Sequence, residues 1–131
     1  MTMNKYVLEK IERLQMGEIL ISREGGNSME PILKSKEPVI LVPMTLEEAV
    51  LYLGKGDICF SKIHGVCYTH KVYGVDPEKG VLIGNNSGHL NGWTRNIYAK
   101  AFLIPRESQG KGVIENYLQG FINNWKGYDR L

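Results

Sequence analysis

Two β-rich segments, residues 57–63 and 66–75, are separated only by His64 and Gly65. Their β-branched and aromatic side chains favour strands, and a two-residue connection that contains glycine favours a tight hairpin. This hairpin constrains the fold more than any other feature, because it commits the centre of the chain to an antiparallel sheet. The 15 glycines of the chain also favour short strands and tight turns over long helices.

Helical patterns lie near the two ends of the chain. A helix over residues 4–15 is predicted, because Asn4 can cap it and apolar side chains follow at helical spacing. These apolar side chains are Tyr6, Val7, Ile11 and Leu14. A second helix is predicted over residues 113–126, where an apolar stripe recurs at every fourth residue and is expected to pack on the core. The stripe consists of Val113, Tyr117, Phe121 and Trp125.

The segment between the helices, residues 18–104, is predicted to form a β core. Further strands are expected at residues 18–23, 38–43, 81–84 and 97–104. A capping-box pattern at Thr45 and Glu48 predicts a short helix over residues 46–53, and residues 85–95 are expected to form a polar loop. The chain is therefore predicted to be a mainly β single domain, residues 1–131, with short N-terminal and C-terminal helices.

The composition is that of an ordinary folded protein, with 43% hydrophobic and 23% charged residues. The 16 basic and 14 acidic residues nearly balance, so charge alone does not indicate a nucleic-acid or membrane surface. No apolar run approaches the ~20 residues of a membrane span, and the N-terminus lacks the apolar block of a secretory signal. Two cysteines do not make a disulfide framework, so a cytoplasmic protein with reduced thiols is expected.

The segment Gly-Gly-Asn-Ser-Met-Glu-Pro, residues 25–31, is the most informative part of the chain for chemistry. A serine after Gly-Gly-Asn can be presented on an exposed bend, and Pro31 fixes the backbone that follows. Successive N–H groups around such a bend can bind an anion, as the oxyanion hole of an acyl-transfer enzyme does. From this segment alone, an ordinary serine in an ordinary turn is the simpler interpretation.

A nucleophilic serine needs a base, and the predicted strand over residues 66–75 offers His70 and Lys71. Neighbours on a strand point to opposite faces, so only one of these two can face Ser28. A base held on a rigid strand suits catalysis, whereas a strand histidine without a partner is usually a half-buried polar residue.

Four short boxes occur in an order that resembles the signal-peptidase/LexA-like serine peptidase superfamily. They are Ser-Met-Glu-Pro at 28–31, Gly-Asp-Ile at 56–58, Tyr-Thr-His-Lys-Val-Tyr-Gly-Val at 68–75 and Gly-Asn-Asn at 84–86. The resemblance runs from Gly25 to Ile104, which is most of the chain. More narrowly, Gly-Asn-Ser-Met and Gly-Asn-Asn followed by Asn-Gly-Trp resemble small stand-alone members of bacteria and their phages. The resemblance implies a LexA/signal-peptidase-like β fold and serine peptidase activity.

The resemblance also implies roles for individual residues. Ser28 would be the nucleophile and His70 the base, at a position where bacterial signal peptidases have lysine and archaeal ones have histidine. Lys71 would match a neighbouring arginine as a supporting or surface residue, with a Ser–Lys pair as the alternative. The backbone N–H groups of Asn27 and Ser28 would hold the oxyanion, and an extended peptide or protein substrate would add as a β-strand beside Ser28.

Three features depart from the family pattern. Asn85 stands where the Gly-Asp-Asn turn has an aspartate that would orient a histidine base, and Gly26 replaces a second serine of bacterial signal peptidases. From this sequence we also expect no membrane anchor and no DNA-binding domain ahead of Ser28, and it contains no Ala-Gly bond for self-cleavage. Two hypotheses follow: a soluble serine endopeptidase with a Ser28–His70 dyad, or a catalytically silent binding or regulatory module of phage or bacterial origin. A homodimer through the β core or the C-terminal helix is a possible partner arrangement.

A metal site is the competing chemistry, because Cys59, His64, Cys67 and His70 lie close together in sequence. With the hairpin turn at His64, Cys59 lies opposite His70 and Cys67 lies opposite Lys62. In this register the four side chains face different sides of the sheet or its tip, so they cannot converge on one ion. We expect no metal and no cofactor, and cysteines that pack as small apolar residues.

The polar loop expected over residues 85–95 offers a second binding surface. It could bind an extended peptide, or a nucleic acid stacked on Trp93. A loop held by its own side-chain hydrogen bonds, with Trp93 in the core, is the simpler interpretation, so no nucleic-acid partner is expected. Asn85 and His89 are possible supporting residues of the site around Ser28.

Overall fold

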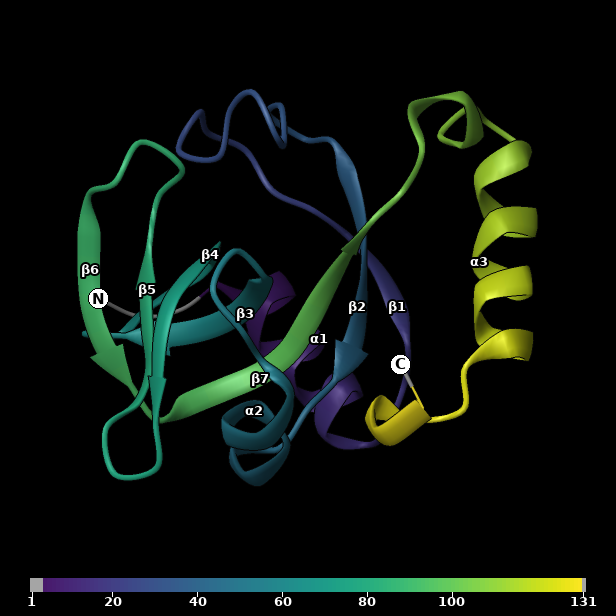
Figure 1. The fold of residues 1–131 in the computed structure, drawn as a ribbon. Coiled ribbons are helices and arrows are strands. Elements are labelled where there is room, and N and C mark those ends of the chain that lie inside the picture. Colours follow the sequence, from purple (N-terminus) through teal and green to yellow (C-terminus); the bar gives the residue numbers. More distant parts are fainter. Residues whose placement is uncertain (1–3, 131) are drawn as a thin grey trace.

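A computed structural model describes residues 4–130 of the chain. Its helices and strands are, in chain order, α1 (Lys5–Gln15), β1 (Leu20–Arg23), β2 (Pro38–Pro43), α2 (Leu46–Tyr52), β3 (Ile58–Ile63), β4 (Val66–Asp76), β5 (Gly80–Gly84), β6 (Leu90–Thr94), β7 (Asn96–Leu103) and α3 (Val113–Asn124). Short 3-10 turns at Arg106–Ser108 and Tyr128–Arg130 flank α3. The protein is therefore mainly β, as predicted, with a helix near each end (Figure 1).

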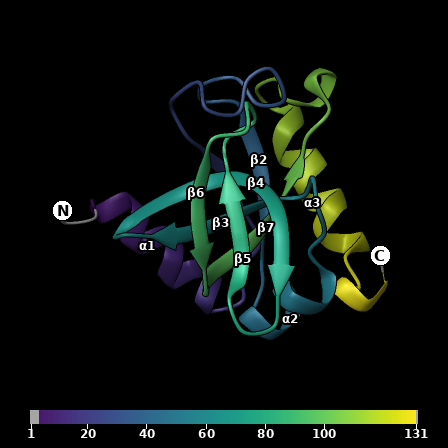
Figure 2. The same cartoon turned by 60° about the vertical axis from the view of Figure 1, so that its left-hand side comes forward.

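The seven strands form one antiparallel sheet in the order β1-β2-β7-β3-β4-β5-β6. β3 and β4 pair as the predicted hairpin, and the predicted register is confirmed, with Cys59 opposite His70 and Cys67 opposite Lys62. β7 returns to the middle of the sheet and pairs with both β2 and β3 (Figures 1 and 2). The last strand thus joins the β1–β2 pair to the central hairpin.

β2 shows how the core divides between the two faces of the sheet. Every residue of this strand except the last is buried, as a continuous apolar run predicts when both faces are covered. Val39 and Leu41 belong to a cluster that includes the buried side chains of α1. Ile40 and Val42 belong to a second cluster that includes Ala49 of α2. The alternation of side chains along one strand therefore feeds two separate apolar layers.

Both predicted N-terminal caps are present. The Asn4 side chain accepts a hydrogen bond from the N–H of Val7 at 3.0 Å, so α1 begins directly after Asn4. Thr45 and Glu48 form the reciprocal capping box, in which each side chain accepts a hydrogen bond from the other residue's N–H. These local interactions satisfy N–H groups that would otherwise lack a partner in the first turn.

The apolar stripes of the helices are narrower than predicted. Tyr6 is 80% exposed, because it lies about 100° around α1 from Val7 and off the buried stripe. Val113 is also exposed, and its neighbour Ile114 is the buried residue in the first turn of α3. The other three residues of the C-terminal stripe pack against the core as predicted; they are Tyr117, Phe121 and Trp125.

The prediction of a loop over residues 85–95 is wrong for the second half of this segment. Only residues 85–89 form a turn, and β6 follows and pairs with β5 in the register Val81↔Thr94 and Ile83↔Gly92. β6 is an edge strand, so its outer side tolerates the polar residues that suggested a loop. A register shift between Ile83 and Gly84 and a positive φ at Gly92 further disguise the strand pattern.

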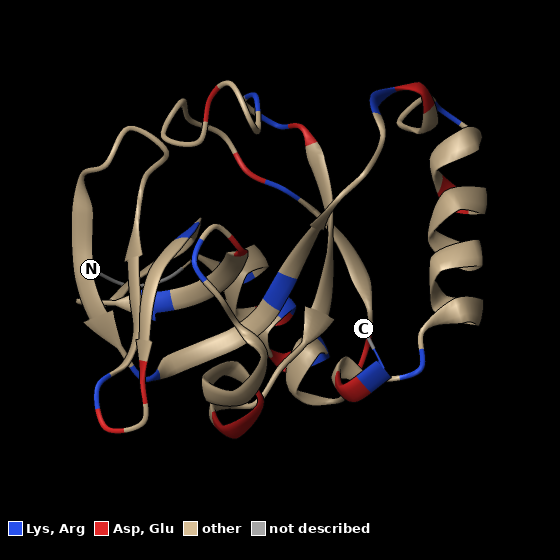
Figure 3. Cartoon of the chain, viewed as in Figure 1, with Lys and Arg blue, Asp and Glu red and all other residues tan. Residues whose placement is uncertain are grey.

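Charged side chains are distributed over the helices, the strands and the loops. Figure 3 shows acidic and basic residues interspersed in this view, while the turn between β5 and β6 carries neither. Among residues 4–130, no helix has the length and apolar character needed to cross a bilayer.

The C-terminal end is tied to the sheet by a buried hydrogen bond that can be tested. The Tyr128 hydroxyl donates to the Val42 carbonyl at 2.7 Å, while its ring packs edge-on to Trp125. We predict that Tyr128→Phe lowers the free energy of unfolding by about 1–2 kcal/mol, because it removes a buried hydrogen bond while keeping the ring. Urea denaturation measures this loss, and Tyr6→Phe at an exposed position is the matched control. An equal stability of Tyr128→Phe and the unchanged protein would contradict this account of the C-terminal end.

Candidate active site

Two side chains from distant parts of the chain meet at one end of the sheet. Ser28 lies in the loop of residues 24–37 between β1 and β2, and His70 lies in β4. The Ser28 Oγ is 3.1 Å from the His70 Nε2. The two residues that the sequence paired are thus in hydrogen-bond contact, which is the arrangement that a nucleophilic serine and its base require.

The other ring nitrogen of His70 contacts a residue of β6. His70 Nδ1 is 2.7 Å from Asn91 Oδ1. An amide oxygen only accepts hydrogen bonds, so Nδ1 of His70 carries the proton and Nε2 is left to accept from the Ser28 hydroxyl. The three side chains form a hydrogen-bonded chain in which Asn91 selects the tautomer that a general base needs.

Asn85 stands where the resembling family has an aspartate that orients the base, but its side chain forms hydrogen bonds within the turn between β5 and β6. Its Oδ1 accepts hydrogen bonds from the N–H groups of Ser87 and His89 at 3.1 and 2.9 Å, which closes the turn between β5 and β6. Its carbonyl accepts a hydrogen bond from the Tyr73 hydroxyl. In the described part of the chain Asn85 makes no hydrogen bond to His70. Asn85 therefore builds the turn, and the contact expected from it is made by Asn91.

Asn91 was not singled out from the sequence, because residues 85–95 have the composition of a loop. A hairpin signal is nevertheless present. The turn Asn-Asn-Ser-Gly separates two segments that become strands of equal length, β5 and β6. If these two segments pair as a hairpin, Asn91 lies on β6, on one side of β5. His70 lies on β4, on the other side of β5.

The Ser28 loop is fixed by packing and by hydrogen bonds to the β5–β6 turn. Met29 and Leu33 are buried in the apolar cluster beneath the loop. The Asn86 N–H donates to the Ser28 carbonyl at 2.8 Å, and the Asn86 amide donates to the Glu30 carbonyl at 3.0 Å. Figures 1 and 2 show the loop and the turn side by side at the same end of the sheet. Ser28 is consequently held in place although its side chain is exposed.

The imidazole of His70 lies in a shielded environment. Only 5% of His70 is exposed, and its ring stacks on Tyr68 with 4.6 Å between centroids. Burial lowers the pKa of His70 below the ordinary value of 6.5, because the imidazolium form loses hydration. The contact with Asn91 and the charge of Glu24 oppose this shift in pKa, and His89 adds to it. The lowered pKa favours the neutral ring, which is the form that accepts a proton.

An oxyanion site needs backbone N–H groups that are not already bonded to a protein acceptor, and the N–H groups of Asn27 and Ser28 are expected to form this site. Within residues 4–130, the N–H groups of Asn27 and Ser28 donate to no protein acceptor. Both residues are exposed. The carbonyl of Asn27 accepts from the Glu30 N–H at 3.2 Å, which bends the chain directly after Ser28.

Two other residues expected near the site do not contact Ser28. Strand alternation directs Lys71 away from the side of His70, and its Nζ lies 5.6 Å from the centroid of the Tyr73 ring. His89 is exposed, and its backbone N–H is used in the turn. His70 is thus the member of the His70–Lys71 pair that reaches Ser28.

Trp93 does not lie in the core as expected. It is 38% exposed, and the Lys79 Nζ lies 5.4 Å from its ring centroid. Trp93 lies on the edge strand β6, and its ring is close to Gly74 of β4, whereas Asn91 of the same strand reaches His70. The expectation that the turn is held by its own side chains is confirmed by the hydrogen bonds of Asn85.

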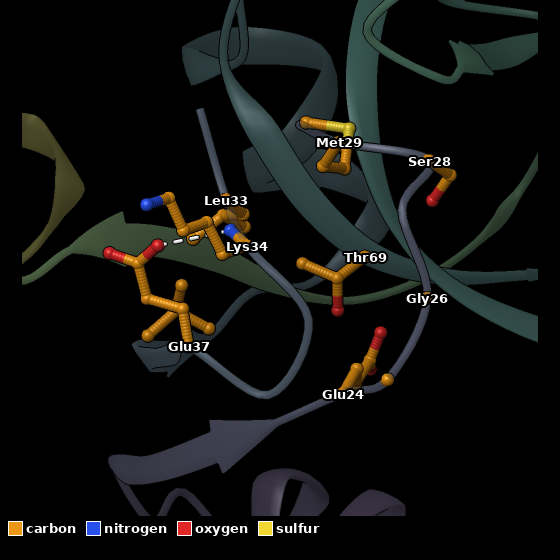
Figure 4. A pocket seen from close by; sticks show the side chains of 10 residues that line it. Glu24, Gly26, Ser28, Met29, Leu33, Lys34, Glu37 and Thr69 are labelled. Atoms are coloured by element: carbon orange, nitrogen blue, oxygen red, sulfur yellow. Dashed lines mark hydrogen bonds between the residues drawn. The ribbon is translucent and has the colours of Figure 1, made fainter. Parts of the chain in front are cut away.

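A small pocket lies beside Ser28 (Figure 4). Its volume is about 30 Å³, far below the roughly 300–1,000 Å³ of pockets that bind drug-sized ligands. Its walls combine the loop of residues 24–37 with β2 and β4, and the lining side chains include Met29, Leu33, Val39, Glu24 and Thr69. A side chain of only a few atoms can enter it.

The cysteines differ in burial. Cys59 is fully buried, and burial raises the pKa of its thiol to about 12, as expected of a cysteine that packs as an apolar residue. Cys67 is only partly buried. Within residues 4–130, no group of three or more His, Cys, Asp or Glu side chains is placed to hold a metal ion.

Comparisons of the chain with protein-family models, with curated proteins and with solved structures find no match.

The protonation of His70 gives a direct test of this geometry. We predict that His70 titrates below pH 6.5 in an NMR titration, and that Asn91→Asp raises its pKa because a carboxylate beside Nδ1 stabilises the imidazolium. Since the pKa of His70 is lower in the folded than in the unfolded state, His70 also stabilises the fold above pH 6.5. This stabilisation is lost as the pH falls through the window below 6.5.

The His70→Gln variant assigns the titrating resonance and should lose that part of the pH dependence of stability. A His70 pKa at or above 6.5, or one that Asn91→Asp leaves unchanged, would contradict the arrangement.

Proposed function

We propose that this protein is a serine endopeptidase of the signal-peptidase/LexA-like kind. Ser28 is the nucleophile, His70 is the general base, and Asn91 positions His70. The observation that carries the proposal is the hydrogen-bonded chain from Ser28 Oγ through both nitrogens of His70 to Asn91. Three elements far apart in sequence supply these groups, and each group is in the state that nucleophilic catalysis needs.

The placement of the sequence boxes supports the family part of the proposal. The Ser-Met-Glu-Pro box contacts the box at residues 68–75, here called the strand box, through Ser28 and His70. It contacts the Gly-Asn-Asn box through the hydrogen bond from Asn86 to Ser28. The Gly-Asp-Ile box enters β3, where Ile58 pairs with Lys71 of the strand box. Four segments that are scattered along the chain are therefore neighbours around one site.

In the first half of the reaction, Ser28 Oγ attacks the carbonyl carbon of the scissile peptide bond. His70 Nε2 takes the hydroxyl proton, and the carbonyl oxygen becomes an oxyanion held by the N–H groups of Asn27 and Ser28. Asn91 accepts from Nδ1 throughout and keeps the ring aimed at Ser28. The imidazolium then protonates the leaving amine as the C–N bond breaks, which leaves an acyl ester on Ser28.

The second half regenerates the protein. His70 removes a proton from a water molecule that attacks the ester carbon. Collapse of the second tetrahedral intermediate returns the proton to Ser28 Oγ and releases the carboxyl product. Asn91 carries no charge, so it orients the ring and raises the pKa of His70 less than an aspartate would.

An extended peptide or protein segment is the substrate that the surroundings favour. Ser28 and Asn27 are exposed, and the small pocket beside Ser28 can receive the side chain of the residue whose carbonyl is attacked. We place the substrate along the loop of residues 24–37 as an added strand, which lets backbone hydrogen bonds provide much of the affinity.

Paired alanine variants test the proposal. We predict that Ser28→Ala and His70→Ala each lower peptide hydrolysis by at least about a thousand-fold, because they remove the nucleophile and its base. Digestion of a complex peptide mixture, with new termini identified by mass spectrometry, measures the activity. Lys71→Ala and His89→Ala are the matched controls, since neither side chain contacts Ser28, and both should retain cleavage.

Cleavage that survives in Ser28→Ala would overturn the proposal. The rival interpretation, a catalytically silent binding module, predicts a different result. In that case the purified protein cleaves no peptide, and it captures a specific partner with an affinity that Ser28→Ala leaves unchanged.

A further inference from the structure

Asn91, the residue that contacts Nδ1 of His70, is followed directly by a glycine. Residues 91–92 are the only Asn-Gly pair of the chain. In such a pair the backbone nitrogen of the glycine can attack the side-chain amide carbon of the asparagine, because glycine has no Cβ that hinders the approach. The amide that orients His70 is therefore also the amide of this chain that is chemically most prone to deamidation.

The structure ties both members of this pair to the site. Asn91 Oδ1 lies 2.7 Å from His70 Nδ1 and accepts its hydrogen. Gly92 has a φ of +127°, and a Cβ atom at this position would lie 3.1 Å from Cδ1 of Ile63. The backbone conformation and the close approach both favour glycine over any other residue. The reactive pair is consequently part of the geometry that holds His70.

Asn91 also lies outside the regular pairing of β6 with β5. Ile83 pairs with Gly92 and Gly84 pairs with Leu90, so Asn91 is the extra residue of a bulge. The extended backbone of a regular strand keeps a side-chain amide away from the following backbone nitrogen, and a bulge interrupts that conformation. Asn91 and Gly92 are both partly exposed, so water can reach the pair.

The contact with His70 favours the attack on the amide carbon. When the backbone nitrogen of Gly92 bonds to this carbon, negative charge develops on Asn91 Oδ1. His70 Nδ1 already donates a hydrogen bond to the same oxygen. A donor that is in place before charge develops stabilises the transition state, as in an oxyanion hole. The hydrogen bond that orients the His70 ring thus also activates Asn91.

We propose that Asn91 is a site of spontaneous deamidation, and that its conversion to aspartate places a negative charge directly beside His70. The nitrogen of Gly92 bonds to the side-chain carbon of Asn91 and loses its proton, and the side-chain nitrogen leaves as ammonia. Water then opens the resulting succinimide at one of its two carbonyl carbons, which gives aspartate or isoaspartate at position 91. The only co-reactant is water, and no atom is oxidised or reduced.

The aspartate product changes the protonation of His70. A carboxylate next to Nδ1 stabilises the imidazolium, so it raises the pKa of His70. Glu24 and His89 are the other titratable groups that act on the pKa of His70, and Tyr68 stacks on its ring; deamidation alters none of these residues. The acid limit of peptide cleavage then moves to higher pH. This effect on cleavage rests on the proposed function, whereas the conversion of Asn91 does not.

Ageing of the folded protein in mildly alkaline buffer tests the first part of the proposal. Peptide mapping by mass spectrometry follows the replacement of an amide by a carboxylic acid at each asparagine. We expect residue 91 to convert several-fold faster than Asn27 and Asn86, which are followed by serine. Asn91→Gln is the matched control, because its longer side chain would have to close a larger ring, and we expect no conversion at position 91.

An NMR titration of the aged protein tests the second part. We expect a second His70 resonance that titrates at higher pH, with the pKa of the Asn91→Asp variant and an intensity that follows the aspartate fraction. Conversion of Asn91 only in protein unfolded by urea, or slower than that of Asn27 and Asn86, would overturn the proposal. An aspartate product that leaves the His70 titration unchanged would overturn it as well.

Neither measurement depends on cleavage of a peptide. A protein that deamidates at Asn91 and shifts the His70 titration supports the inference even if Ser28 cleaves nothing, an outcome that would reject only the proposed function. Cleavage by a protein whose Asn91 stays intact would support the peptidase and reject the deamidation site.

Discussion

The two hydrogen bonds of Asn86 hold the site together. They join the turn between β5 and β6 to the carbonyls of Ser28 and Glu30, so the loop that carries Ser28 is tied to the same hairpin that carries Asn91. Each such bond contributes only about 1 kcal/mol. Their importance is geometric, because they fix the exposed Ser28 relative to the buried His70. Met29 anchors the loop from below. The sheet thus supplies rigid positions for His70 and Asn91, and the loop is docked onto them.

In the proposed mechanism His70 is the base, and no negative charge is in direct contact with its ring. Burial lowers the pKa of His70, and the neutral Asn91 sets the tautomer without reversing that shift. An aspartate in the same place would favour the imidazolium and move the acid limit of activity upward. Glu24 lies further away and only partly opposes the effect of burial on the pKa of His70. The arrangement therefore keeps His70 ready to accept a proton at neutral pH, and stacking on Tyr68 restrains the ring.

Local signals predicted the fold where side-chain pattern and backbone conformation agree. The hairpin register that places Cys59 opposite His70 followed from a two-residue turn, and the caps at Asn4 and Thr45 followed from their side chains. The pairing of Ser28 with His70 came from the resemblance, since no local pattern brings together residues 42 positions apart. Asn91 was missed because β6 is an edge strand with a polar outer side and a bulge, so its pattern matches that of a loop.

The central claim is that the imidazole of His70 activates the hydroxyl of Ser28. Its most direct test is the rate at which a fluorophosphonate reagent modifies the protein, followed by intact-mass and peptide mapping across a pH series. The account predicts a single adduct on Ser28, with a rate that rises with pH along the titration curve of His70 measured by NMR. The account also predicts that the His70→Gln variant does not form this adduct. Modification of Ser28 that does not follow the His70 titration, or no adduct on Ser28 at any pH, would contradict the account.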